Sequence, residues 1–156
     1  MQDTIEGGCR CGAVRYRIAR PDLPRAYACH CLTCQTWTGS AFSLQCVVPE
    51  ASLEVTGTPH LYERVSDDGE RLSRQRGCAL CLTRVYNTNS ARPGMAVIRA
   101  GTLDRSDEVK IVAHIWAKRK LDGIDIPTGA PAWPEGAPPD EFIELNLVTN
   151  AAYSGR

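Results

Sequence analysis

The chain has 156 residues, of which 43% are hydrophobic, and its 18 lysine and arginine residues balance its 18 aspartate and glutamate residues. This length favours one compact domain that buries roughly two thirds of the surface of its unfolded chain, and the balanced charge excludes the strong field that would attract nucleic acid or an anionic membrane surface. No apolar run approaches the roughly 18 residues of a transmembrane helix, and residues 1–6 lack the basic and apolar regions of a signal peptide, so we expect a cytoplasmic protein without nucleic-acid or membrane partners.

Short β-rich runs separated by turn residues follow one another along most of the chain. The predicted strands are 13–18, 41–48, 52–56, 60–65, 71–76, 84–88, 96–100 and 110–115. Helical character is confined to a turn or two around residues 32–37 and a short piece near residues 103–108. The pattern predicts an all-β fold, mainly antiparallel, in a single domain with little helix.

From residue 127 onward proline and glycine become dense. They stand at Pro127, Gly129, Pro131, Pro134, Gly136, Pro138 and Pro139. Because proline donates no backbone hydrogen bond and breaks helices, this composition predicts neither a strand ladder nor a helix. We expect residues 1–126 to form the domain and residues 127–156 to form an arm packed irregularly on it, with Trp133 and Phe142 as anchors. A disordered tail is the alternative.

Seven of the eight cysteines fall into three tight groups. The groups are Cys9-x-Cys11, Cys29-x-Cys31-x-x-Cys34 and Cys78-x-x-Cys81. The eighth, Cys46, lies in an apolar run that favours core packing. A reducing compartment disfavours structural disulfides, so clustered thiols indicate metal binding or catalysis. Metal binding is therefore the leading interpretation.

The first and last groups together supply four thiolates, which suit a closed tetrahedral zinc site of the structural kind. Such a site would join the first strand to a hairpin more than sixty residues later, where closing a long loop stabilises a β-rich core. Leu82 follows Cys81 where a metal-binding turn commonly has glycine, which predicts a less relaxed turn. Four unligated buried thiols are the alternative.

The middle group has three cysteines and one further candidate ligand, His30. In an extended segment His30 would point away from both neighbouring cysteines, so we do not expect it to bind the same ion. Three protein ligands with an open fourth position are typical of a catalytic zinc, which can bind a thiolate, lower the pKa of a bound water or polarise a carbonyl. Two alternatives stay open: a redox dithiol at Cys31-x-x-Cys34, and a second structural site completed by Cys46, His60 or His114.

The residues just after this group are candidates for ligand contact. Thr38 and Ser40 offer hydroxyls, and Gly39 allows a backbone amide to approach closely. Trp37 could line a pocket there. A plain turn that carries an aromatic side chain into the core is the alternative. His114 is interpreted either as core packing or as a proton carrier or hydrogen-bond donor beside the open position.

The three cysteine groups, in this order, resemble the glutathione-dependent formaldehyde-activating family, which also includes centromere protein V. The matching residues are Gly8-Cys9-x-Cys11-Gly12-x-Val14, Cys29-His30-Cys31-x-x-Cys34 with Thr38-Gly39-Ser40-Ala41-Phe42, and Cys78-x-x-Cys81. The later runs His114-Ile115-Trp116, Asp125-Ile126-Pro127 and Pro131-x-Trp133-Pro134 are similar too. The resemblance extends from about residue 4 to about residue 142.

This resemblance implies a β-tent fold stapled by zinc, with two zinc ions per chain. Motif matching assigns Cys9, Cys11, Cys78 and Cys81 to a structural ion, and Cys29, Cys31 and Cys34 to a catalytic ion. The implied activity is a carbon–sulfur lyase reaction, run as the condensation of glutathione with the aldehyde formaldehyde to S-(hydroxymethyl)glutathione. For the carboxylates of glutathione, only arginines such as Arg15, Arg84 and Arg99 can be named. A non-catalytic two-zinc binding module that docks a protein partner is the alternative.

Overall fold

Ten strands in two sheets and two α-helices make up the described part of the chain, which covers residues 4–66 and 69–147 of this computed structural model. The smaller sheet contains β1 (Thr4–Gly8), β2 (Arg15–Ala19) and β5 (Leu53–Thr56). Strand β2 is central, and it pairs antiparallel with both neighbours. Alternation along β2 buries Tyr16 and Ile18, so this sheet has one apolar and one solvated face.

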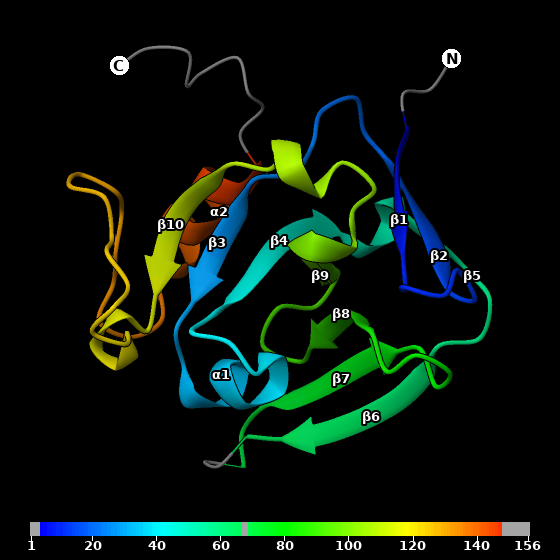
Figure 1. Ribbon diagram of the computed structural model, residues 1–156, viewed down its shortest axis with the longest axis horizontal. Coiled ribbons are helices and arrows are strands. Elements are labelled where there is room, and N and C mark those ends of the chain that lie inside the picture. The colour runs from blue at the N-terminus through cyan, green and yellow to red at the C-terminus, as the bar shows by residue number, and fades with distance from the viewer. Residues whose placement is uncertain (1–3, 67–68, 148–156) are drawn as a thin grey trace.

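The larger sheet has seven strands in the order β10-β3-β4-β9-β8-β7-β6. Their bounds are β3 (Ala26–Cys29), β4 (Ser43–Pro49), β6 (His60–Val65), β7 (Leu72–Gly77), β8 (Arg84–Asn89), β9 (Met95–Arg99) and β10 (Ile111–Ile115). All neighbours are antiparallel except β10 and β3, which run parallel. Figure 1 shows the smaller sheet at the right of this larger one. The expected mainly antiparallel, all-β fold with little helix is confirmed.

The main core lies between the two sheets. Its buried residues include Ile5 and Ile18 of the smaller sheet and Val48 and Ile98 of the larger one. Cys46 belongs to the same cluster and is fully buried, as its apolar run predicts. Because side chains alternate along β4, the residues next to Cys46 in sequence point to the opposite face of the larger sheet. That opposite face carries both helices and the candidate site.

Helix α2 (Pro139–Leu147) covers the apolar part of this face. Phe142 is buried against Tyr27 of β3, with ring centroids 4.7 Å apart, and Trp133 packs against the same cluster. The prediction that the segment after residue 126 forms no helix is wrong, whereas no strand ladder occurs in its described residues. Pro139 occupies the first helical position, where proline is tolerated, and Ala132 forms a β-bridge with His114 of β10.

Most predicted strands agree with the observed ones within two residues, whereas β1 and β3 were not predicted. The expected helix after the middle cysteines is α1 (Leu32–Thr38). Near residues 103–108, where a short helical piece is expected, the structure has only the 3-10 turns η2 (Ala100–Thr102) and η3 (Ser106–Glu108). Two further 3-10 turns are η1 (Glu50–Ser52) and η4 (Ala117–Arg119). Within the described residues no helix is long and apolar enough to cross a membrane. Residues 148–156 of the expected arm lie outside the described part, and the division at residue 126 stays a prediction.

Candidate metal centres

The loops of two distant hairpins bring four thiols together. Cys9 and Cys11 lie in the loop between β1 and β2, and Cys78 and Cys81 lie in the loop between β7 and β8. All four sulfur atoms lie within 4.8 Å of one another. These four residues, here called the outer centre, therefore join the smaller sheet to the larger one (Figure 1).

The spacing of these sulfur atoms fits a tetrahedral metal ion. Cys9 Sγ lies 3.5 Å from Cys11 Sγ, and Cys11 Sγ lies 3.6 Å from Cys78 Sγ. With metal–sulfur bonds of about 2.3 Å, a tetrahedron has sulfur–sulfur separations of about 3.8 Å. The donor set and its geometry thus suit a closed four-thiolate site that leaves no ligand position open.

Hydrogen bonds from the loops stabilise thiolate at this centre. The Val14 amide donates to Cys9 Sγ over 3.2 Å, and the Thr83 hydroxyl lies 3.2 Å from Cys81 Sγ. Hydrogen bonds from the hydroxyl and the amide of Thr83 lower the pKa of Cys81 to about 5. Leu82 takes a left-handed backbone conformation with φ of 60°, which glycine would adopt without strain. The less relaxed turn predicted at Leu82 is confirmed.

A second group of three thiols, here called the inner centre, lies where β3 passes into α1. Cys29 ends β3, Cys31 is the N-cap of α1 and Cys34 lies in its first turn. The three sulfur atoms lie within 4.8 Å of one another, and among the described residues no fourth metal-binding side chain joins them. The structure therefore brings together all seven grouped cysteines as one set of four and one set of three.

The inner centre favours thiolate at Cys31. Hydrogen bonds from the Cys29 and Cys34 thiols, together with the Cys34 amide at 3.3 Å, lower the pKa of Cys31 to about 2. The Gln45 side-chain amide donates to Cys34 Sγ over 3.2 Å, and the Tyr27 hydroxyl donates to the Gln45 oxygen. The sulfur atoms are thus held from both the helix and the sheet, with an open side toward the adjoining pocket.

His30 does not share the orientation of its cysteine neighbours. Its ring is fully buried, stacks on His114 with centroids 5.3 Å apart, and has its Nε2 3.0 Å from His114 Nδ1. The expectation that His30 points away from the thiols therefore agrees with the structure. His114 is itself buried in this pair and does not line the pocket beside the thiols, which favours its interpretation as core packing.

A cavity of about 540 Å³ adjoins the inner centre. Besides the three cysteines it is lined by Leu32, Thr33, Trp37, Gln45, Arg64, Ser66, Arg71, Ser73, Gln75, Arg84, Asn87, Asn89, Arg99, Trp116 and Arg119. Five of these residues are arginines, and no aspartate or glutamate of the described residues is among them. The cavity thus combines thiols with a basic, hydrogen-bonding lining.

The floor of this cavity is a row of polar side chains across the larger sheet. Gln45 of β4 stands directly opposite Arg99 of β9, and Asn87 of β8 stands opposite Gln75 of β7, so each pair shares a face. Arg99 Nη2 donates to Gln75 Oε1 over 3.1 Å and also to Asn87 Oδ1. These polar residues are buried. They lie on the same face of the larger sheet as the apolar cluster that α2 covers.

Arg84 reaches the same floor because of an irregularity in β8. Gly77 pairs with Arg84 and the preceding Arg76 pairs with Tyr86, so β8 has one extra residue at this point. Arg84 Nη2 donates to Gln75 Oε1 over 2.8 Å, and its guanidinium lies 3.9 Å from the ring centroid of Trp37 on α1. Burial lowers the pKa of Arg84 to about 9, and the positive charge of Arg99 adds to this effect.

The residues expected to contact a ligand after the middle cysteines are only partly placed at this cavity. Trp37 lines it, whereas Thr38 and Ser40 line a neighbouring surface pocket. The Thr38 hydroxyl donates to the Cys34 carbonyl over 2.8 Å, and Gly39 ends α1 in a left-handed conformation. Thr38 and Gly39 therefore terminate the helix. This structural role favours the interpretation of these two residues as a plain turn.

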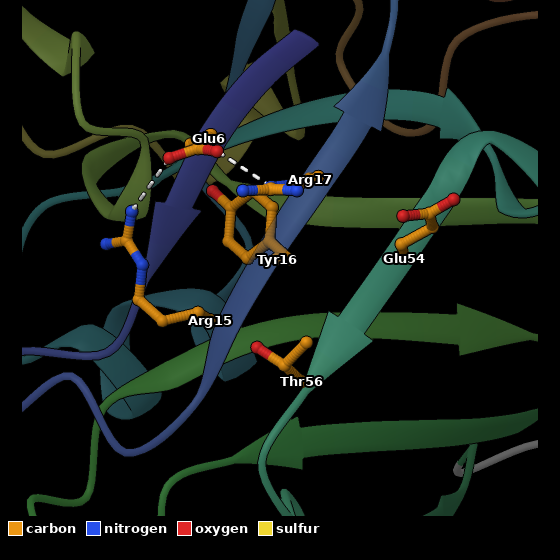
Figure 2. Close-up of a pocket in the computed structure, with 6 residues that line it drawn as sticks. All are labelled: Glu6, Arg15, Tyr16, Arg17, Glu54 and Thr56. Carbon is orange, nitrogen blue, oxygen red and sulfur yellow. Dashed lines mark hydrogen bonds and ion pairs between the residues drawn. The ribbon is translucent and has the colours of Figure 1, made fainter.

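Arg15, another expected carboxylate-binding residue, lies in a different pocket. That pocket, on the solvated face of the smaller sheet, is lined by Glu6, Arg15, Tyr16, Arg17, Glu54 and Thr56 (Figure 2). Arg15 pairs with Asp104, and Arg17 donates to Glu6 over 2.7 Å. In this pocket both arginines have carboxylate partners, whereas no carboxylate in the described part of the chain pairs with Arg84 or Arg99.

Gln45, Gln75 and Asn87 were not predicted as site residues. Each lies in a strand at an inward position that a half-buried sheet would normally fill with an apolar side chain. The signal available in the sequence is a polar residue where an apolar one is expected. Asn87 and Asn89, two residues apart and therefore on the same face of β8, are an example. Their convergence depends on the strand order, which local sequence patterns do not reveal.

Comparisons with known proteins agree with this arrangement. Residues 4–119 match the model of one protein family, described as glutathione-dependent formaldehyde-activating enzyme. A protein of Halomonas elongata, whose name describes it provisionally as a glutathione-dependent formaldehyde-activating enzyme, is 25% identical over 127 residues, or 78% of this chain and 80% of the relative. A crystal structure of a Rhodobacter sphaeroides protein is 16% identical, with a TM-score of 0.50, and covers 82% of this chain and 98% of that one. The likeness to the crystal structure concerns the fold alone.

Proposed function

Because the chain belongs to the family of glutathione-dependent formaldehyde-activating enzymes, we propose that it is a zinc-dependent carbon–sulfur lyase acting on a small thiol–aldehyde adduct such as S-(hydroxymethyl)glutathione. The observation that carries this proposal is the inner centre: three thiols with no fourth ligand among the described residues, facing a cavity of about 540 Å³. An open position at a three-ligand metal site is where a reactant binds.

Zinc suits both centres by the chemistry of their donors, since thiolate sulfur in a tetrahedral arrangement is a preferred environment for this ion. Cys9, Cys11, Cys78 and Cys81 would hold a structural ion, and Cys29, Cys31 and Cys34 would hold a catalytic one. At the inner centre zinc would supply a Lewis acid that holds a thiol as thiolate or polarises an aldehyde.

The protein's own residues bind and orient the two reactants. In the condensing direction a bond forms between the thiol sulfur and the carbonyl carbon, and the thiol proton ends on the carbonyl oxygen. Gln45 donates a hydrogen bond to Cys34 Sγ, and Trp37 and Leu32 line the cavity beside the thiols. Binding in this cavity would bring the two reactants together. Since no histidine or carboxylate of the described residues lines the cavity, water is the proposed carrier of the proton.

Metal content and turnover of cysteine variants test the proposal. Cys31→Ser should leave a folded protein with about one zinc per chain and no catalysis, whereas Cys78→Ser should lose the β-sheet signal in circular dichroism because the outer centre joins the sheets. Cys46→Ala, which alters a cysteine outside both centres, should keep both zinc ions and activity. Catalysis is measured by NMR as the rate of exchange between glutathione and S-(hydroxymethyl)glutathione above the uncatalysed rate.

Two outcomes would count against the proposal. If Cys31→Ser and Cys78→Ser were equally unfolded and equally poor in zinc, the catalytic assignment of the inner centre would have no basis. If the wild-type protein, loaded with two zinc ions, turned over none of several thiol and aldehyde pairs, a non-catalytic binding module would be the better description.

A further inference from the structure

We propose that Arg84 and Arg99 form a carboxylate-binding subsite beside the inner centre, which selects a small thiol with a carboxylate a few bonds from its sulfur and no ammonium group. This inference rests on the proposed function, because it assumes that a thiol reactant binds at the inner centre. It differs from that function in naming the charge and size of the thiol.

The first support is that neither guanidinium group has a carboxylate partner among the described residues; the negative charge nearest to both comes from the thiolates of the inner centre. Arg99 is only 8% exposed, yet its Nε and Nη1 have no hydrogen-bond partner among the described residues, and the same holds for Nη1 of Arg84. Arg84 donates instead to the neutral amide oxygen of Gln75, and Arg99 donates to the amide oxygens of Gln75 and Asn87. Burying an arginine without a counter-charge is unfavourable, so a bound anion would stabilise this floor.

The second support is the contrast within the same molecule. On the solvated face of the smaller sheet, Arg15 and Arg17 both contact Glu6 (Figure 2), and Arg15 also pairs with Asp104, although these side chains are far more exposed than Arg99. Carboxylates thus pair with these surface arginines, where an ion pair contributes least to stability, whereas no carboxylate of the described residues pairs with the buried Arg99. This distribution is expected where the missing negative charge arrives with a ligand.

The position of the pair relative to the thiols sets the length of the ligand. Arg99 stands opposite Gln45 in the ladder, and the Gln45 amide contacts Cys34 Sγ at 3.2 Å. A thiol whose sulfur occupies the open side of the inner centre would have its next few atoms over this floor. A carboxylate on a short chain could therefore accept hydrogen bonds from both guanidinium groups in one geometry.

Charge also disfavours a cationic or zwitterionic thiol. Before a reactant binds, three thiolates with one divalent cation would carry a single net negative charge, so the charges of Arg84 and Arg99 together exceed it by one. The described lining holds five arginines and no carboxylate that could receive an ammonium group. A mercapto acid without an amino group fits this lining better than glutathione, whose γ-glutamyl end carries an ammonium beside one of its carboxylates.

Thiol binding to the cobalt-substituted protein tests the inference without turnover. Sulfur-to-cobalt absorption would be followed during titration with mercaptosuccinate, glutathione, neutral 2-mercaptoethanol and cationic cysteamine; the outer centre, with four protein ligands, has no position for them. We expect mercaptosuccinate to bind most tightly and cysteamine most weakly. Arg84→Gln and Arg99→Gln should weaken mercaptosuccinate binding roughly tenfold or more and leave 2-mercaptoethanol binding unchanged.

Arg17→Gln, in the other pocket, is the matched control and should alter none of these affinities. If Arg99→Gln does not fold, Arg84→Gln, at a half-buried position, carries the test. The inference is wrong if the arginine variants weaken all thiols equally or lower the affinity for cobalt, because the arginines would then only balance the charge of the thiolates. It is also wrong if glutathione binds more tightly than mercaptosuccinate.

The two proposals fail in different ways. If thiol affinity follows the charge of the thiol but no adduct is turned over, the lyase proposal is wrong and the carboxylate subsite is supported. If adducts are turned over but thiol affinity does not depend on the charge of the thiol, the lyase proposal is supported and the carboxylate subsite is wrong.

Discussion

Leu82 occupies a backbone conformation that suits glycine. Among the described residues, the other non-glycine residue with positive φ is Trp116. Leu82 is 83% exposed, so its side chain gains little from burial to offset the strain of the left-handed region. The strain is held in place by the surrounding loop, whose Leu82 amide donates to the Cys78 carbonyl over 2.9 Å.

Replacing Leu82 by glycine should therefore stabilise the protein. We expect Leu82→Gly to raise the free energy of unfolding by about 0.5–1 kcal/mol, the relief of strain less the entropy that glycine adds to the unfolded chain. Urea unfolding at saturating zinc measures this. Leu80→Gly, at a position that is 80% exposed but has no positive φ, is the control and should not stabilise. Equal effects of both substitutions would show that the backbone of Leu82 is not strained.

The buried pair of His30 and His114 should make stability depend on pH. Burial lowers the pKa of both rings below the ordinary value of 6.5, and for His30 the charges of His114 and Lys120 add to this. The unfolded chain then binds more protons than the folded one as the pH falls below about 6.5, so the contribution of the pair to stability is complete above that pH and is lost below it.

Comparing variants separates this effect from that of the metal-binding thiols. Between about pH 8 and pH 5.5, the free energy of unfolding of His114→Gln should fall less steeply with decreasing pH than that of the wild type. His60→Gln, which changes the exposed third histidine, should run parallel to the wild type. Three parallel curves would contradict the buried, neutral state of the pair.

At the scale of elements, Phe142 is the side chain of α2 that is most deeply buried among those described. Phe142 is 1% exposed and contacts Tyr27 edge-on, while Arg92 lies over its ring at 4.4 Å from the centroid. Phe142→Ala should lower the free energy of unfolding by about 3 kcal/mol, since removing a buried aromatic ring loses its burial and leaves a cavity. Ile143→Ala, at the neighbouring position that is 46% exposed, should cost far less in the same urea titration. Similar losses for both would mean that α2 does not dock through Phe142.

The elements differ in how far the sequence revealed them. Strands such as β6 and β8 have the composition and bounding turns of typical strands, and their predicted ranges agree closely with the observed ones. Strand β3 was missed because it is buried on both faces and therefore does not alternate. Helix α2 escapes prediction because dense proline disfavours a helix in general, whereas proline at the first helical position is compatible with one.

The candidate site was predictable where its residues are close in sequence. The seven cysteines come in short-range groups whose spacing indicates metal binding. The floor of the cavity combines Gln45, Gln75, Asn87 and Arg99 from four strands, and no local pattern connects these positions. Arg84 joins them only because β8 contains an extra residue, a feature that depends on its pairing with β7.

At the scale of the whole molecule, the outer centre joins two sheets that otherwise meet through one apolar core. Removing metal should therefore affect global stability and not a local loop alone. During titration with a chelator, we expect the β-sheet signal in circular dichroism to decrease together with release of the ion of the outer centre. Release of both ions from a protein that keeps its full β-sheet signal would contradict this role.

Hairpin β7–β8 contributes both to the outer centre and to the cavity beside the inner centre. Its turn carries Cys78 and Cys81 of the outer centre, and its strands carry Gln75, Arg84 and Asn87 of the cavity floor. We therefore expect occupancy of the outer centre and ligand affinity in the cavity to be thermodynamically linked through this hairpin. By reciprocity, the factor by which the outer ion strengthens ligand binding in the cavity equals the factor by which that ligand strengthens retention of the ion.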